Sequence, residues 1–419
     1  AGSVSRDNGI MKQSNLNEFN NNIDLRKYTV RSNIDMNLTE STKAVVRVSG
    51  AFDDYTGPIP GGSELYYNTL RVSPVNFPAY YLPDKTYANS QHILFGNMDQ
   101  GQYLNPYAEM VRGYRASNSS TMMAQIELEQ DFSQWVDGLK ARFLANTIRY
   151  SNFNLSRSFA PFYYTMTGYN RKTGEYRLME LNPEGGREYL SYNEGGKTVN
   201  TSIYSESSLM YNKIFDDKHD VSGMLVFMTR NALNGNAGSL SASLPQRNLG
   251  LAGRFTYGFD SRYFSEFNFG YNGSEKFDAN HRWGFFPSFG LGWILSNEQF
   301  WEGPIANLVS LLKVRGTYGL VGNDQIGAER FFYLSRVQIN AGNSFGTGYD
   351  VPGRRRSGTS ISHYSNPLIT WEVSYKQNLG IELGLFDGKV NIITDIYKEH
   401  RENILQYRSQ HIPRIEQFV

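Results

Sequence analysis

The sequence contains no cysteine, and it also lacks a long apolar run and an excess of either charge. Without cysteine the chain can form neither a disulfide framework nor a thiolate metal site. No apolar run approaches the roughly 20 residues of a membrane-spanning helix. Because the formal net charge is only +1, nothing attracts the chain to a polyphosphate, and no nucleic-acid partner is expected.

Catalytic motifs are missing as well. The six histidines are scattered without an HExxH pair, and no GxSxG elbow, P-loop or GxGxxG phosphate cradle occurs. Glu127 and Glu129 would share one face of a strand, which is the arrangement that an acid–base pair requires. The next strand brings Lys140 and Arg142 to that same face, which favours cross-strand ion pairs. We therefore expect no enzyme activity, no cofactor and no metal.

Aromatic residues are abundant instead. The 419 residues include 29 Tyr, 26 Phe and 5 Trp, beside 40 Gly, and the mean hydropathy is −0.49. A water-soluble globule rarely combines so many aromatic residues with such low hydropathy. Strands of a transmembrane barrel do combine them, because lipid-facing and lumen-facing residues are averaged together.

Apolar and polar side chains alternate along about twelve segments, which is the pattern of half-buried strands. Between Leu249 and Tyr271, for example, large apolar residues fall on one side, and Arg254 and Glu266 fall on the other. Most segments are near the 9–11 residues that cross a bilayer with tilt. The predicted strands lie at about 27–36, 43–53, 122–131, 139–145, 201–214, 221–230, 249–257, 263–271, 286–295, 311–320, 379–386 and 389–397.

The predicted connections alternate between short and long. The short ones are polar turns such as FDDKH, FDSR and FDGK, with one longer segment at 296–310 that we expect to be partly helical. The long ones lie at about 54–119, 153–199, 231–246, 274–284 and 322–373. Short turns at one rim and long loops at the other are typical of bacterial outer-membrane barrels. The pattern predicts an all-β, antiparallel transmembrane β-barrel. It does not distinguish a small closed barrel from part of a larger one.

Six segments in order resemble the SusC-like family of TonB-dependent outer-membrane transporters of Bacteroidota. They are SPVNFPAYY (73–81), NPYAEMVRGYRASNS (105–119), RYFSEFNFGYNGSEKF (262–277), FFPSFGLGWILSNEQFW (285–301), LKVRGTYGLVGNDQIG (312–327) and NPLITWE with the region up to ENIL (366–405). The resemblance covers most of the chain, from about residue 20 to residue 408.

This resemblance implies a 22-stranded barrel with a plug domain, located in the outer membrane of a Gram-negative bacterium. It implies a SusD-like lipoprotein as a lid, energy from the TonB complex, and import of oligosaccharides or, in some members, peptides. The chain has no recognisable signal peptide, plug or TonB-contact segment, and it begins AGSVSRDNG without Met. We therefore expect residues 1–419 to be one partial barrel domain, the central strands of a longer protein, without the plug and terminal strands.

Two sets of residues are candidates for function. Aromatic side chains in the long loops suit sugar rings, although loops also need aromatics for packing. The candidates for substrate binding are Tyr66, Tyr67, Tyr80, Tyr81, Tyr87, Tyr107, Trp283 and Tyr349. Polar residues on the lumen side of the strands would hold a plug or line a wet path. This polar wall comprises Arg47, Lys140, Arg142, Arg254, Glu266, Lys313 and Arg315.

Two other functions stay open at the level of sequence. A passive porin or surface-binding barrel would use the same strands without energy coupling. A soluble β-rich protein that binds or hydrolyses carbohydrate would bury the apolar faces in a core. That alternative predicts that Phe143, Phe269 and Val314 lie between packed layers, whereas a barrel places them on a lipid-facing exterior.

Overall fold

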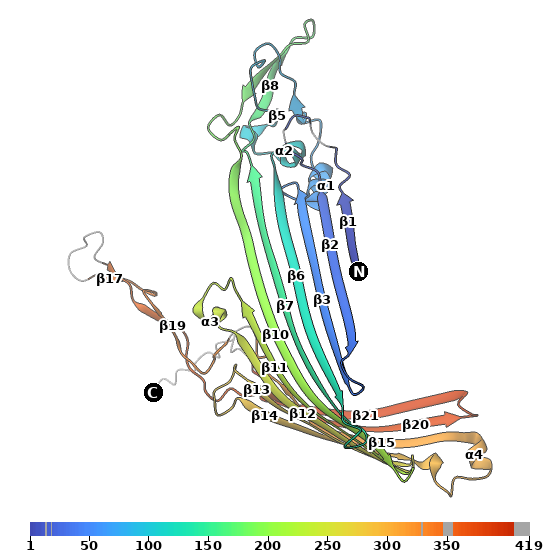
Figure 1. Ribbon diagram of the computed structural model, residues 1–419. Coiled ribbons are helices and arrows are strands. Elements are labelled where there is room, and N and C mark those ends of the chain that lie inside the picture. Colours follow the sequence, from blue (N-terminus) through green and yellow to red (C-terminus); the bar gives the residue numbers. More distant parts are fainter. Residues whose placement is uncertain (13–14, 18, 328–329, 347–354, 406–419) are drawn as a thin grey trace, which may run out of the picture.

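The structure is a computed structural model, and it describes residues 1–12, 15–17, 19–327, 330–346 and 355–405. Thirteen antiparallel strands form one long, strongly twisted sheet (Figure 1). In order across the sheet the strands are β1 (Gly2–Asn8), β2 (Asp24–Asn37), β3 (Thr42–Gly57), β6 (Gly113–Asp131), β7 (Leu139–Ser158), β10 (Ser191–Phe215), β11 (His219–Asn234), β12 (Gln246–Phe259), β13 (Tyr263–Ser274), β14 (Trp283–Ile294), β15 (Val309–Asn323), β20 (Glu372–Leu385) and β21 (Val390–Glu402).

The all-β, antiparallel fold class is confirmed, and each of the twelve predicted strands is present. The strand that sequence reasoning missed is β1, which pairs with β2 from Gly2 opposite Val30 to Asn8 opposite Asp24. Its sequence GSVSRDN has a single large apolar residue, so it shows no alternation. The outer strands β1 and β21 do not pair with each other, and the sheet is therefore open.

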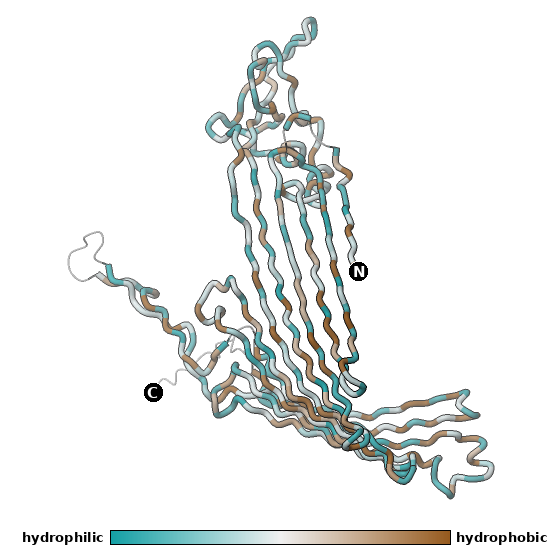
Figure 2. The backbone as a smooth tube through the Cα atoms, in the orientation of Figure 1, coloured by the Kyte–Doolittle hydropathy of each residue, from teal (hydrophilic) through white to brown (hydrophobic). Residues whose placement is uncertain are grey.

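Hydrophobic and hydrophilic residues alternate along the strands in Figure 2, and because successive side chains of a strand point to opposite faces, the two faces of the sheet differ in chemistry. On one face Ile126 lies opposite Val46, and Phe289 lies opposite Phe267 on the neighbouring strand. Both side chains remain accessible, since Ile126 is 44% exposed and Phe289 is 57% exposed. Phe143 is 41% exposed, and Phe269 and Val314 are also not buried. The apolar face is therefore not covered by a second layer within the described residues.

The observed connections alternate in length along the sheet. The short ones are residues 38–41, 132–138, 216–218, 260–262 and 386–389, and the long ones are 58–112, 159–190, 235–245, 275–282 and 324–371. Residues 295–308 are an exception, because this connection lies at the end with the short turns but is longer than 235–245 and 275–282. Several strands are longer than a bilayer crossing requires, since β10 alone has 25 residues, and the loops are correspondingly shorter than expected. The segment at 295–308 contains the expected helical turns, η2 (Leu295–Asn297) and α4 (Pro304–Leu308).

Two long loops pack together at one end of β1 to β10, and we call residues 58–112 and 159–190 the loop cap (Figure 1). It contains α1 (Gly62–Arg71), β4 (Tyr80–Tyr81), β5 (Leu94–Gly96), η1 (Asp99–Gly101), α2 (Pro106–Val111), β8 (Tyr163–Tyr169) and β9 (Tyr176–Glu180). A second sheet with the order β4-β5-β8-β9 joins the two loops, and its β5–β8 pair is parallel. Among the described residues, no helix is both long and apolar enough to cross a membrane.

The remaining elements belong to the other long loops. They are α3 (Leu240–Ser243), β16 (Arg336–Ile339), β17 (Phe345–Gly346), β18 (Arg355–Arg356) and β19 (Thr359–His363). Buried side chains are concentrated in two small clusters, both outside the single-layered sheet. One cluster, Phe95, Ala108 and Val111, is the core of the loop cap, and the other contains Phe277, Ile326, Phe332 and Trp371. The long loops are therefore folded units with cores of their own.

Candidate functional site

The loop cap is organised around Asn105, which precedes α2. Its side-chain oxygen accepts hydrogen bonds from the backbone N–H groups of Tyr107 (3.0 Å) and Ala108 (3.1 Å) and so caps the helix. Its amide nitrogen donates to the carbonyls of Ala79 and Gly96, both at 2.8 Å. Asn105 is 1% exposed, so these four bonds satisfy a buried amide completely. Sequence reasoning did not single out Asn105, although an Asn before Pro106 is a helix-start signal.

The two loops of the cap are joined side chain to side chain at His92. Its Nδ1 lies 2.8 Å from a Glu188 carboxylate oxygen, and its Nε2 lies 2.9 Å from the Tyr164 hydroxyl. A neutral ring with its proton on Nδ1 satisfies both contacts, because it donates to the carboxylate and accepts from the phenol. The His92 ring also stacks on the Phe162 ring, with centroids 4.1 Å apart. Burial raises the pKa of Tyr164 to about 12, and it raises the pKa of Tyr163 to the same value.

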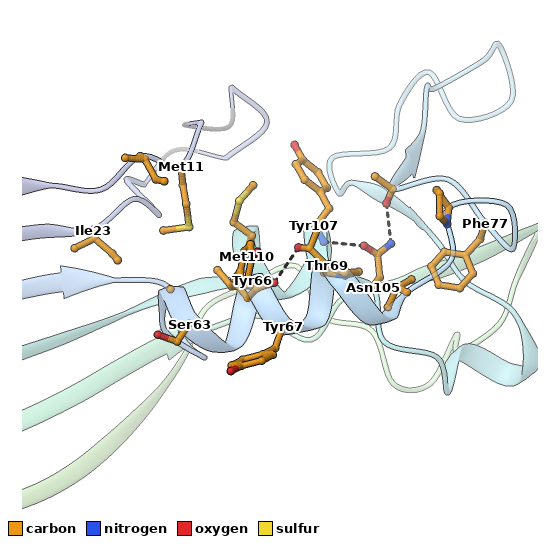
Figure 3. A pocket seen from close by; sticks show the side chains of 17 residues that line it. Met11, Ile23, Ser63, Tyr66, Tyr67, Thr69, Phe77, Asn105, Tyr107 and Met110 are labelled. Carbon is orange, nitrogen blue, oxygen red and sulfur yellow. Dashed lines mark hydrogen bonds between the residues drawn. The ribbon is translucent and has the colours of Figure 1, made fainter.

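An open cavity of about 1110 Å³ lies beside this core, between α1, the start of α2 and the segment that follows β1 (Figure 3). Three predicted residues, Tyr66, Tyr67 and Tyr107, line it. Tyr80 stacks on Tyr107 with ring centroids 5.2 Å apart, so it supports the wall of the cavity. Tyr66 is 65% exposed and Tyr67 is 58% exposed, which leaves both rings accessible from solvent.

The other predicted aromatic residues lie elsewhere. Tyr81 packs against Tyr176, and the Tyr87 ring lies against Tyr164. Burial raises the pKa of Tyr87, as it does for Tyr81. Both side chains therefore stabilise the loop cap. Tyr349 lies outside the described residues.

The structure does not bring Trp283 to the cavity. Trp283 is the first residue of β14, because this strand begins earlier than predicted. It lies opposite Gly273 on β13. Its ring stacks on Tyr271 with centroids 5.0 Å apart. Alternation along β14 places it on the same face as Phe285, which is the apolar face. An aromatic residue at the end of a strand on that face is typical of an interfacial girdle.

The seven residues of the predicted polar wall all form ion pairs on the sheet. Arg142 pairs with Glu127 at 2.7 Å and with Glu206 at 3.8 Å, while Arg47 reaches Glu127 at 3.6 Å. The remaining pairs are Lys140–Asp131 (3.5 Å), Arg254–Glu266 (3.0 Å), Lys313–Glu382 (3.5 Å), Arg315–Glu382 (3.1 Å) and Arg315–Asp395 (2.8 Å). Glu129, the other carboxylate of the candidate acid–base pair, has no ion pair within 4.0 Å among the described residues.

Four of these wall residues also share a hollow of about 620 Å³ on the polar face. Arg254 and Glu266 lie on one side of it, and Lys313 and Arg315 lie on the other, with Gly290 and Gly292 between them. Among the described residues, no group of three or more His, Asp or Glu side chains is arranged to hold a metal ion. The polar face thus offers neutralised charges and hydrogen-bonding groups.

Comparison with known proteins identifies relatives among bacterial receptors. No protein-family model matches the chain. TonB-dependent receptor P39 of Formosa agariphila is 24% identical over 95% of this chain and 35% of its own length. TonB-dependent receptor SusC of Bacteroides thetaiotaomicron is 31% identical over 36% of this chain and 15% of its own length. The chain is thus similar in sequence to TonB-dependent receptors, SusC among them.

Solved structures support the same fold. The RagAB peptide transporter matches with a TM-score of 0.58 and 18% identity, over 92% of this chain and 41% of that one. The curated relatives are named as receptors, not as enzymes. Three TonB-dependent receptors of Formosa agariphila each match more than 90% of this chain, and the chain spans about a third of their length.

Proposed function

We propose that this chain is the barrel wall and mouth of an outer-membrane importer in a Gram-negative bacterium. Thirteen strands would contribute to a barrel of about 22 strands, the size of plugged outer-membrane transporters. The observation that carries the proposal is the two-faced, single-layered sheet. Its apolar side chains remain exposed, whereas its charged side chains neutralise one another on the opposite face. Lipid suits the first face and an enclosed aqueous passage suits the second.

The partners follow from the same assignment. We propose that a SusD-like lipoprotein covers the end that carries the long loops, and that the TonB complex supplies energy through a plug. The loop cap and the loops around Trp371 would form the mouth where nutrient is held before it passes inward. The ion-paired wall would then stay wet without binding a charged nutrient strongly, because its charges are already paired. Oligosaccharides and peptides are the two candidate substrate classes.

Growth of a deletion strain tests this function. Removal of the gene should abolish growth on at least one oligosaccharide or peptide source, and the intact gene should restore it. A variant in the TonB-contact segment of the full-length receptor should behave like the deletion. Unchanged growth of the deletion strain on every such source would contradict import.

A further inference from the structure

We propose that the cavity beside α1 binds apolar side chains of an oligopeptide. This inference rests on the proposed import function and assigns its substrate class. The cavity is open to solvent. Helix α1, which lines it, lies at the end of the sheet that carries the loop cap, where an arriving nutrient would meet it (Figure 1). None of its seventeen lining residues is charged.

Most polar groups of the lining are already used within the protein. All four hydrogen-bonding positions of Asn105 are occupied by backbone groups. The Thr69 hydroxyl donates its proton to the Leu65 carbonyl at 2.8 Å. Among the described residues, only the hydroxyls of Ser63, Tyr66 and Tyr67 line the cavity without such a partner.

This inventory separates the two substrate classes. A sugar carries several hydroxyl groups, and each one loses its bonds to water when it enters a site that offers no replacement. Carboxylate and free amide groups, which commonly replace those bonds, are absent from the lining within the described part of the chain. An oligosaccharide therefore finds only three hydroxyls and the tyrosine rings here, which are too few partners for the many hydroxyl groups that it would desolvate.

An apolar or aromatic side chain fits the same lining well. Ile23, Leu65, Phe77 and Met110 present hydrocarbon and thioether surface. Methionine is unbranched and polarizable, so Met11 and Met110 can adapt to side chains of different shape. The unused tyrosine hydroxyls can bond to peptide backbone groups at the rim. The volume, about 1110 Å³, slightly exceeds the range of ordinary ligand pockets, so the cavity can hold more than one side chain.

Binding measurements on the full-length receptor test the assignment, using the protein as purified from the outer membrane with any lid protein that accompanies it. Three probes are compared by calorimetry: a capped glycine pentapeptide with a central tryptophan, the same peptide with a central serine, and a glucose hexasaccharide. Two variants, Ser63→Trp and Thr69→Trp, each fill the cavity from α1. Glu64→Trp adds the same bulk one residue away, at an exposed position outside the lining.

We expect the tryptophan peptide to bind the parent receptor at least about tenfold more tightly than the serine peptide, because only an apolar group gains from the lining. Both filling variants should weaken that binding by at least about tenfold, whereas Glu64→Trp should leave it unchanged. Equal binding of the two peptides, or unchanged binding in both filling variants, would overturn the assignment. The assignment would also be overturned if only the hexasaccharide bound to the parent receptor and both filling variants weakened its binding. That last result would leave import intact, since growth of the deletion strain tests import separately.

Discussion

Arg142 on β7 donates a 2.7 Å hydrogen bond to Glu127 on β6, although the residue directly opposite Glu127 is Leu144. The guanidinium therefore crosses diagonally to the next position on the polar face. Arg47 on β3 reaches the same carboxylate from the other side at 3.6 Å. One carboxylate thus neutralises cations from two neighbouring strands, and it is only 13% exposed.

Removal of this shared carboxylate should destabilise the protein. We expect Glu127→Gln to lower the free energy of unfolding of the full-length receptor by about 1–3 kcal/mol, because two cations lose a charged hydrogen-bond acceptor. Denaturant unfolding in lipid vesicles measures the change. Glu129→Gln is the matched control, because Glu129 lies two residues away on the same face without an ion pair in the described part of the chain. Equal losses in the two variants would contradict the assigned role of Glu127.

A charge on the apolar face should be tolerated much less well than a charge on the polar face. Phe289 and Ser288 are adjacent near the middle of β14 and point to opposite faces. We expect Phe289→Lys to destabilise the barrel by about 2–4 kcal/mol and to reduce its amount in the outer membrane, because the charge would enter hydrocarbon. Ser288→Lys should assemble normally. Heat-modifiable migration of the folded barrel in gels reports on both variants.

The loop cap should depend on Asn105. We expect Asn105→Ala to reduce the local stability of the cap by about 1–3 kcal/mol, because the substitution removes a helix cap and the side-chain donor to the buried Gly96 carbonyl. Hydrogen exchange in residues 94–111 should accelerate while the main sheet stays protected. Asn89→Ala, at an exposed position of the same loop, should change nothing. Exchange that rises equally in both variants would show that Asn105 does not organise the cap.

The loop cap should also loosen at high pH. Burial raises the pKa of Tyr164 to about 12 in the folded cap, whereas an exposed tyrosine titrates near 10. The unfolded state then loses its proton first as the pH rises. The stability contributed by the neutral phenol is therefore complete below about pH 10 and is lost progressively toward pH 12.

Hydrogen exchange of the loop cap between pH 9 and pH 12 follows this loss, after correction for the intrinsic pH dependence of exchange. The Tyr164→Phe variant should be less stable at neutral pH, because His92 loses its hydroxyl partner, but its stability should vary less with pH. A pH dependence as steep as that of the parent receptor would assign the effect to other groups.

The sequence predicts the main sheet well because alternation is a local property. Phe143 and Val314 occupy the face that alternation assigns to them, and their strands pair with their neighbours along the chain. The loop cap could not be predicted in the same way. Its sheet joins Phe95 to Tyr163, which are far apart in the sequence, through strands as short as two residues.

Errors at strand ends have a similar cause. Trp283 was assigned to a loop because aromatic residues near a strand end fit either a loop or the first strand position. Only the pairing of Trp283 with Gly273 shows that the strand has already begun. The cavity is likewise a product of tertiary structure, since Met11, Tyr66 and Met110 come from separate segments. Sequence reasoning identified three of its tyrosines but not their apolar neighbours.

The most direct test of the account is the accessibility of adjacent residues on β6. The described chain has no native cysteine, so single nitroxide labels can be placed at Ile126 and at Gln125 in the full-length receptor after replacement of any cysteine elsewhere. Ile126 points to the apolar face and Gln125 to the polar face. In lipid vesicles, we expect fast relaxation of the Ile126 label by oxygen, and fast relaxation of the Gln125 label by a water-soluble nickel complex. Equal accessibility of both labels to the nickel complex, or the reverse pattern, would contradict a sheet with one face in lipid and one in an aqueous lumen.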